Sequence, residues 1–241
     1  MLAGGTDLIP QLREGRRLAR HLVDLKRIPE LTAIVALPGG AISIGAAATL
    51  TSIAQHPSIA AHYPSIAQSA RLVGSLQVQN RASLGGNICN AAPSADAVPP
   101  LICHEARATI AGRSGQREMA VGELFRGPGR TLLEADELLT AIILPPPPTR
   151  SAARYLRFTP RREMDIAIAG AGVWLSLDTR GSVAAARIVL ASVGPTPMRA
   201  HAADSHPRLC SSRLAALPRE SRNRSRIPAA RQTIGASSCR C

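Results

Sequence analysis

The spacing of apolar residues changes near residue 106, and this change limits the folds that the chain can adopt. Upstream of it, residues 49–74 have helical spacing interrupted at Pro57 and Pro64, and proline is compatible with a helix only near its start. Downstream, strand-like alternation dominates, in the runs 106–111, 117–121, 138–144, 154–158, 166–178 and 182–192. A mixed first half followed by a strand-rich second half predicts the α+β class.

The remaining elements of the first half are short. A helix is expected from Leu8, with Gly15 as its stop signal, and a strand over 21–25. Residues 32–37 and 41–48 read as two strands joined by a turn at Pro38-Gly39-Gly40. Residues 77–96 show no clear periodicity and are predicted to be a loop, which leads into a helix over 98–103.

Composition argues against a nucleic-acid partner despite a formal net charge of +13. Residues 201–241 alone contribute about half of this charge, with eight arginines against Asp204 and Glu220. Only Lys26 is a lysine, an arginine bias that GC-rich coding produces without selection for phosphate contacts. The chain also has only five aromatic residues, too few for a platform that stacks single-stranded bases.

The last 41 residues depart from the rest of the chain. Residues 201–241 combine eight Arg, seven Ser and three of the five Cys, without a sustained apolar period. Such a segment buries too little apolar surface to fold alone, so we predict a disordered tail. A shifted reading frame in GC-rich DNA and a regulatory tail are the two explanations for this composition.

The sequence predicts neither a membrane span nor a metal site. The apolar run at 167–177 is about half of the ~20 residues that a span requires. Residues 1–10 lack the basic start and apolar stretch of a secretory signal, so the chain reads as cytoplasmic. The five cysteines contain no C-x-x-C pair, and neither a disulfide framework, a zinc site nor an iron–sulfur cluster is expected.

Two glycine-containing segments carry the candidate chemistry. In the first, Gly4 and Gly5 allow close approach of a ligand to the backbone, and the helix that follows offers free N–H groups to an anion. In the second, Gly85 and Gly86 precede further polar groups that include Asp96, which is suited to accept hydrogen bonds from sugar hydroxyls. A Gly-Gly pair alone is usually a turn, and neither segment matches the P-loop or the G-x-G-x-x-G motif. Together, however, they supply the polar groups that a dinucleotide such as FAD requires.

Several motifs in a fixed order make the resemblance to a family specific. The segments are 3–8 (AGGTDL), 23–25 (VDL), 28–31 (IPEL), 83–87 (SLGGN), 92–96 (APSAD) and 161–167 (RREMDIA). In this order they resemble the FAD-binding subunit of the molybdenum hydroxylases, which include the medium chain of carbon monoxide dehydrogenase and the flavin domain of xanthine dehydrogenase. The resemblance extends over about residues 2–200.

The resemblance implies which residues bind FAD, and it implies no catalytic residue on this chain. Both glycine segments would hold the pyrophosphate and ribityl region, Asp96 the flavin-side hydroxyls, and Leu138 the adenine or the ring system. Arg157 stands where the family often has a lysine beside the isoalloxazine, and a cation there favours the reduced, anionic flavin. Gln79 replaces an arginine that is common in the family. The implied cofactor residues are Ala3, Gly4, Gly5, Thr6, Asp7, Ser83, Gly85, Gly86, Asn87, Ser94, Asp96, Leu138 and Arg157.

The resemblance also implies an organisation and a role. Residues 1–148 would be an FAD-binding domain with a mixed α/β part and an antiparallel sheet, without the family's first strand and helix, and residues 149–200 part of a small α+β C-terminal domain. The implied role is electron transfer from a molybdenum large subunit and a 2Fe-2S small subunit, through flavin, to NAD, oxygen or a quinone. Two alternatives remain open: a non-functional or frameshifted fragment that does not bind FAD, and a basic nucleic-acid-binding module.

Overall fold

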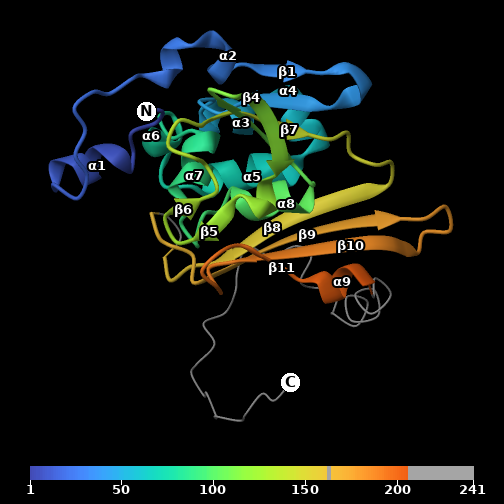
Figure 1. The fold of residues 1–241 in the computed structure, drawn as a ribbon. Coiled ribbons are helices and arrows are strands. Elements are labelled where there is room, and N and C mark those ends of the chain that lie inside the picture. The colour runs from blue at the N-terminus through green and yellow to red at the C-terminus, as the bar shows by residue number, and fades with distance from the viewer. Residues whose placement is uncertain (162–163, 206–241) are drawn as a thin grey trace.

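The computed structural model describes residues 1–161 and 164–205, and it confirms the α+β class (Figure 1). Figure 1 shows helices α5, α7 and α8 between a five-stranded sheet above and a four-stranded sheet below. The helices are α1 (Leu8–Arg13), α2 (Pro29–Thr32), α3 (Leu50–Gln55), α4 (Pro57–His62), α5 (Pro64–Leu72), α6 (Leu76–Gln79), α7 (Leu84–Asn90), α8 (Val98–Cys103) and α9 (His201–Ser205), with 3-10 turns η1 (Leu25–Arg27), η2 (Pro38–Gly40) and η3 (Val121–Glu123).

All three sheets are antiparallel. The five-stranded sheet has the order β1-β2-β7-β3-β4, the four-stranded sheet the order β11-β10-β9-β8, and β5 pairs with β6. The strands are β1 (Ile34–Ala36), β2 (Ile42–Gly45), β3 (Arg107–Gly112), β4 (Gly115–Ala120), β5 (Phe125–Gly127), β6 (Arg130–Thr131), β7 (Leu138–Leu144), β8 (Ser151–Phe158), β9 (Ala169–Leu177), β10 (Val183–Ala191) and β11 (Met198–Arg199).

The helical region 49–74 breaks where the prolines predict. Pro57 and Pro64 occupy the first position of α4 and α5, where the missing N–H has no partner to lose. The side chain of Thr49 caps α3 by accepting a hydrogen bond from the N–H of Ser52 at 3.0 Å. Isoleucines and alanines of these helices are buried in the same apolar core as residues of the five-stranded sheet, so the core forms with few aromatic side chains.

Two of the sequence predictions are wrong. Residues 21–25 do not form a strand, because Asp24 makes an isolated bridge with Leu2 and its side chain then caps the turn η1 through the N–H of Lys26. Residues 77–96 are not a loop, because they contain the end of α6 and the whole of α7. The second glycine segment is therefore the first turn of a helix.

The four-stranded sheet packs directly on α8. Gly172 in β9 makes this approach close, since a Cβ at that position would lie 3.2 Å from the Sγ of Cys103 and 3.2 Å from the Cβ of Pro99. Beside this contact the guanidinium of Arg187 lies 4.0 Å from the ring centroid of Trp174, a cation–π arrangement. Ala153, Trp174 and Val189 of this sheet belong to the same apolar core as the first half of the chain.

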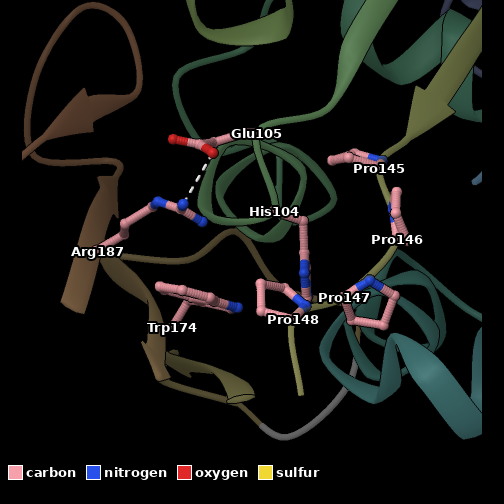
Figure 2. A pocket seen from close by; sticks show the side chains of 8 residues that line it. All are labelled: His104, Glu105, Pro145, Pro146, Pro147, Pro148, Trp174 and Arg187. Carbon is pink, nitrogen blue, oxygen red and sulfur yellow. Dashed lines mark hydrogen bonds and ion pairs between the residues drawn. The ribbon is translucent and has the colours of Figure 1, made fainter. Parts of the chain in front are cut away.

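The proline run between β7 and β8 closes a small cavity at this junction. The cavity has a volume of about 90 Å³, and Figure 2 shows His104 beside Pro147 and Pro148, with Trp174 and Arg187 on the side of the four-stranded sheet. The Tyr63 hydroxyl donates to the carbonyl of Pro145 at 2.7 Å, which ties the start of the run to α5. The connection between the two sheets is thus held on both sides.

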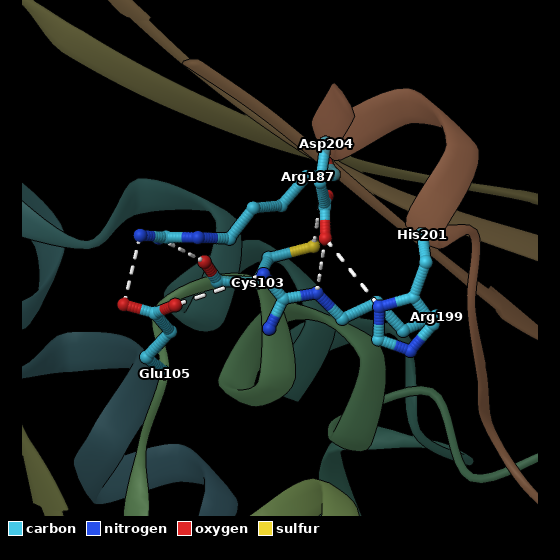
Figure 3. A network of polar contacts seen from close by, with 6 residues as sticks. All are labelled: Cys103, Glu105, Arg187, Arg199, His201 and Asp204. Atoms are coloured by element: carbon cyan, nitrogen blue, oxygen red, sulfur yellow. Dashed lines mark hydrogen bonds and ion pairs between the residues drawn. The ribbon is translucent and has the colours of Figure 1, made fainter. Parts of the chain in front are cut away.

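The segment after β11 is tied to the same junction by charge. Figure 3 shows Arg199 beside Asp204 of α9, with a distance of 2.9 Å between Nε and Oδ2. Arg187 donates to Glu105 at 2.8 Å and to the carbonyl of Cys103 at 2.9 Å. The tail predicted over 201–241 begins within α9, and its remainder lies outside the described residues.

Buried His104 is expected to make stability depend on pH. Burial, assisted by Arg187, lowers the pKa of His104 from 6.5 to about 4. The unfolded chain therefore binds more protons between these values, so the free energy of unfolding falls by up to ~3 kcal/mol as pH drops from 6.5 to 4. Urea unfolding across this range measures the slope. His104→Gln should remove the contribution of His104 to the pH dependence of the free energy of unfolding. His62→Gln, at the exposed end of α4, should retain that contribution.

Candidate functional site

The first glycine segment is a tight turn that leads into α1. Its start is fixed by two backbone bonds, because the N–H of Leu2 donates to Val23 at 2.8 Å and the N–H of Leu25 donates to Leu2 at 2.9 Å. Gly5 has a φ of 76°, in the left-handed region that a side chain disfavours. Thr6 is half-buried and Asp7 is exposed just before α1. The turn therefore presents backbone and short polar groups at one surface.

The second glycine segment begins α7. The hydroxyl of Ser83 accepts a hydrogen bond from the N–H of Gly86 at 3.1 Å, which caps the helix. The N–H of Gly85 donates to the carbonyl of Ala46 at 2.8 Å, and a Cβ on Gly85 would lie 2.6 Å from that oxygen. Gly85 is thus required by packing on the segment after β2.

The first glycine segment packs against the residues just before the second, although about 80 residues separate the two segments in the sequence. A Cβ on Gly4 would lie 2.6 Å from the carbonyl oxygen of Arg81 and 2.7 Å from the Cα of Ala82. Lys26 contacts the same carbonyl, because its Nζ donates to the oxygen of Arg81 at 2.6 Å. Ala3 and Leu138 pack against one small apolar cluster formed by Leu25, Leu31 and Ala47. Leu138 therefore belongs to the region of the first segment.

One polar atom in this region is buried without a partner. The Oδ1 of Asn87, in α7, has no hydrogen bond among the described residues. Unsatisfied buried polar atoms are uncommon in folded proteins and call for a ligand or another partner. Ser94 is half-buried in the segment that follows α7. The Oδ1 of Asn87 is thus free to accept a hydrogen bond from a bound group or a water molecule.

Asp96 and Arg157 form a buried ion pair. The Nη1 of Arg157 lies 2.5 Å from Oδ2 of Asp96, and each side chain is 8% exposed. The Tyr155 hydroxyl donates to Oδ1 of Asp96 at 2.7 Å. Burial raises the pKa of Asp96, an effect that the Tyr155 and Arg157 hydrogen bonds oppose, and burial also raises the pKa of Tyr155. Both oxygens of Asp96 are engaged by side chains of this chain, so a sugar hydroxyl would share them.

Arg157 also lines a large cavity next to α6. This cavity has a volume of about 560 Å³, and its polar wall includes Thr51, Gln55, Arg71, Ser75 and Gln79 as well as Arg157. Leu76, Gln77 and Gln79 lie on this wall, a few residues before the second glycine segment. The cavity therefore lies next to that segment along the chain and next to the Asp96–Arg157 pair in space.

Most of the cavity wall was not identified from the sequence. Gln79 was noted only as a departure from the family, and Thr51, Gln55, Arg71 and Ser75 were not named. Ser75 carries a usable signal, because it precedes a helical turn and accepts a hydrogen bond from the N–H of Val78 at 3.4 Å. In the run 161–167, on which the family resemblance partly rests, residues Arg162 and Glu163 lie outside the described residues.

These residues fit the FAD that the resemblance implies. The turn at Gly4 and Gly5 packs against the residues that lead into α7, and the buried Oδ1 of Asn87 has no partner among the described residues. Arg157 places a cation at the wall of a cavity large enough for a planar ring system.

Among the helices of the described residues, none has the length and apolar character that a membrane span requires.

Two family models account for most of the chain. The model described as the FAD binding domain in molybdopterin dehydrogenase matches residues 1–147, and the model described as the CO dehydrogenase flavoprotein C-terminal domain matches residues 154–206. The first match alone covers more than half of the 241 residues.

Individual relatives agree with these matches. A xanthine dehydrogenase FAD-binding subunit of Escherichia coli O157:H7 is 33% identical over 205 residues, which are 85% of this chain and 70% of the relative. The carbon monoxide dehydrogenase medium chain of Hydrogenophaga pseudoflava is 32% identical over 199 residues, 83% of this chain and 68% of the relative.

Solved structures show the same similarity in three dimensions. Carbon monoxide dehydrogenase from Hydrogenophaga pseudoflava superposes with a TM-score of 0.79 at 33% identity, covering 84% of this chain and 69% of the other. Quinoline 2-oxidoreductase from Pseudomonas putida 86 gives a TM-score of 0.77 at 29% identity, covering 85% and 70%. With the adjoining glycine segments and the buried cation beside the cavity, these matches establish that the chain belongs to the FAD-binding subunits of the molybdenum hydroxylase family of oxidoreductases.

Proposed function

We propose that this chain is the electron-transfer flavoprotein of its complex, which passes electrons from iron–sulfur clusters through FAD to an acceptor. The observation that carries the proposal is Arg157, a buried cation on the wall of the 560 Å³ cavity. A fixed positive charge beside a flavin stabilises its reduced, anionic form. Bound FAD would supply one- and two-electron chemistry, which suits a relay between single-electron clusters and a two-electron acceptor.

The chain's own residues have distinct tasks in this proposal. Residues 3–7 would bind the pyrophosphate and ribityl groups through backbone N–H groups, and residues 83–87 would do so through the Asn87 side-chain amide, because the N–H groups of residues 84–87 are engaged within the chain. Leu138 would contact the adenine or the ring system from the apolar cluster that it shares with Ala3. Asp96 would hold Arg157 and share its oxygens with a flavin hydroxyl.

The proposed partners follow from the names of the relatives. Several of them are called a medium chain or a medium subunit, which describes one component of a complex. We propose a large molybdenum subunit, where the substrate is oxidised, and a small 2Fe-2S subunit. NAD, oxygen or a quinone would be the final acceptor.

The proposal predicts electron transfer without substrate oxidation. We expect the purified chain to quench the fluorescence of added FAD and, once loaded, to reduce a dye with NADH. We expect no oxidation of xanthine, an aldehyde or carbon monoxide by the chain alone. Failure to bind FAD, or oxidation of any of these substrates, would contradict the proposal.

A pair of arginine variants tests the role of the cation. Arg157→Gln should slow flavin reduction by NADH roughly tenfold, because the cavity wall loses the positive charge of Arg157 while Asp96 keeps its negative charge. Arg154→Gln is the matched control, since Arg154 lies three residues earlier in β8 and is exposed, on the opposite face. Equal rates for the two variants would remove Arg157 from the flavin site.

A further inference from the structure

Tyr155 is fully buried in β8 and reaches the candidate site through one hydrogen bond. Its hydroxyl donates to Oδ1 of Asp96 at 2.7 Å. The space for this hydroxyl comes from Gly170 in β9, since a Cβ on Gly170 would collide with the hydroxyl oxygen of Tyr155. Gly170 is the register partner of Arg157. A small residue and a buried phenol thus adjoin the cation of the site.

Asp96 connects Tyr155 to Arg157. Its two oxygens have different partners, because Oδ1 accepts from Tyr155 and Oδ2 lies 2.5 Å from Nη1 of Arg157. Two bonds to different oxygens fix the rotation of the carboxylate as well as its position. Within the described residues, Asp96 is the only carboxylate in ion-pair contact with Arg157. The direction of the guanidinium therefore depends on a carboxylate that Tyr155 holds.

We propose that Tyr155 is a positioning residue of the flavin site, which fixes the Asp96 carboxylate and, through it, the place of the Arg157 cation on the cavity wall. The inference rests on the proposed function, because it gives Arg157 its role beside the flavin. Tyr155 itself does not line the cavity, and the hydrogen bond of its hydroxyl goes to Asp96. It acts on the flavin only through Asp96 and Arg157.

The surroundings of Arg157 show why positioning is required. The cavity wall offers the guanidinium other polar groups, among them Gln55, Gln79 and Thr51. If Asp96 rotates, the guanidinium loses the acceptor that fixes its direction on the cavity wall. The positive charge would then lie at varying distances from the ring, and Coulomb stabilisation falls with distance. The reduced flavin would lose affinity relative to the oxidised flavin.

The test measures this relative affinity. The dissociation constant of oxidised FAD comes from fluorescence quenching, and its ratio to that of reduced FAD comes from the midpoint potential of the loaded protein. In Tyr155→Phe we expect reduced FAD to weaken about tenfold more than oxidised FAD, which for a two-electron couple corresponds to a potential ~30 mV lower. Gly170→Ala, which displaces the hydroxyl and keeps the tyrosine, should shift the ratio in the same direction.

Two controls separate positioning from a general loss of packing. Tyr63→Phe also removes a buried hydroxyl, which donates to the carbonyl of Pro145 at 2.7 Å and does not line the 560 Å³ cavity. This variant should leave the ratio of the two dissociation constants within twofold of wild type. Gly122→Ala adds a methyl group in η3, against the side chain of Ile102 in α8, and should also leave the ratio unchanged. An equal shift in Tyr63→Phe and Tyr155→Phe would overturn the inference.

A double variant tests the path through the cation. If Tyr155 acts through Arg157, then Tyr155→Phe in the Arg157→Gln background should not change the ratio further. Additive shifts would overturn the inference, as would an unchanged or raised potential in Tyr155→Phe when the wild-type chain binds FAD. A wild-type chain that binds no FAD would instead contradict the proposed function, and the inference with it.

Discussion

Replacing Asp96 with alanine is expected to lower the free energy of unfolding by ~3–5 kcal/mol, the usual range for removing one partner of a buried ion pair. The variant would leave the Arg157 guanidinium and the Tyr155 hydroxyl buried without their acceptor. For a chain of this size, each kcal/mol corresponds to about 2–4 °C in melting temperature, so we expect a decrease of roughly 6–20 °C. Calorimetry or thermal unfolding followed by circular dichroism measures it.

An exposed ion pair provides the control for Asp96→Ala. Glu118 accepts from Arg107 at 3.1 Å, and both side chains are about half exposed. Glu118→Ala should change the free energy of unfolding by less than ~1 kcal/mol, because solvent screens the pair. Comparable losses in the two variants would show that the Asp96–Arg157 pair is not buried in solution.

Gly85→Ala is expected to raise the dissociation constant of FAD by ~10- to 100-fold. The new methyl group would lie 2.6 Å from both the carbonyl oxygen and the Cβ of Ala46, so the first turn of α7 must move. Overpacking of this kind costs ~1–3 kcal/mol. A loss of that size in the free energy of FAD binding corresponds to a dissociation constant roughly 10- to 100-fold higher. Titration of FAD by fluorescence quenching measures the change.

Gly122→Ala is the matched control for this variant. Gly122 lies in η3, and a Cβ there would meet only the flexible side chain of Ile102, at 3.4 Å. FAD affinity should stay within about threefold of wild type, since that contact is an ordinary one. A Gly85→Ala chain with the affinity of Gly122→Ala would remove α7 from the FAD site.

Local signals in the sequence predicted the fold where a single residue type dominates the backbone. Pro57 and Pro64 mark the starts of α4 and α5, and the alternation in 138–144 gives β7 with the same bounds. The strand predicted at 21–25 is wrong because Asp24 pairs only with distant Leu2. The loop predicted at 77–96 is wrong because Gly85 and Gly86, which disfavour a helix, lie in a turn that Ser83 caps.

The sequence likewise predicts one part of the candidate site and not the other. The order of the motifs indicated both glycine segments, and their contact at Gly4 and Arg81 agrees with one shared surface. The partners of Asp96 were not predictable, because Tyr155 and Arg157 lie 59 and 61 residues further along the chain. In the sequence, Gly170 is only one residue of a strand pattern. Its structural role is to leave space for the buried hydroxyl of Tyr155. Such pairings depend on tertiary packing that no local pattern encodes.

The proline run Pro145–Pro148 joins two parts that share one buried charge pair. Asp96 comes before the run, whereas Tyr155 and Arg157 come after it. A cut in the run would leave one fragment with an isolated carboxylate and the other with an isolated guanidinium. We therefore expect an exchange of the four-stranded sheet between relatives to preserve stability only when the incoming sheet brings a partner for Asp96.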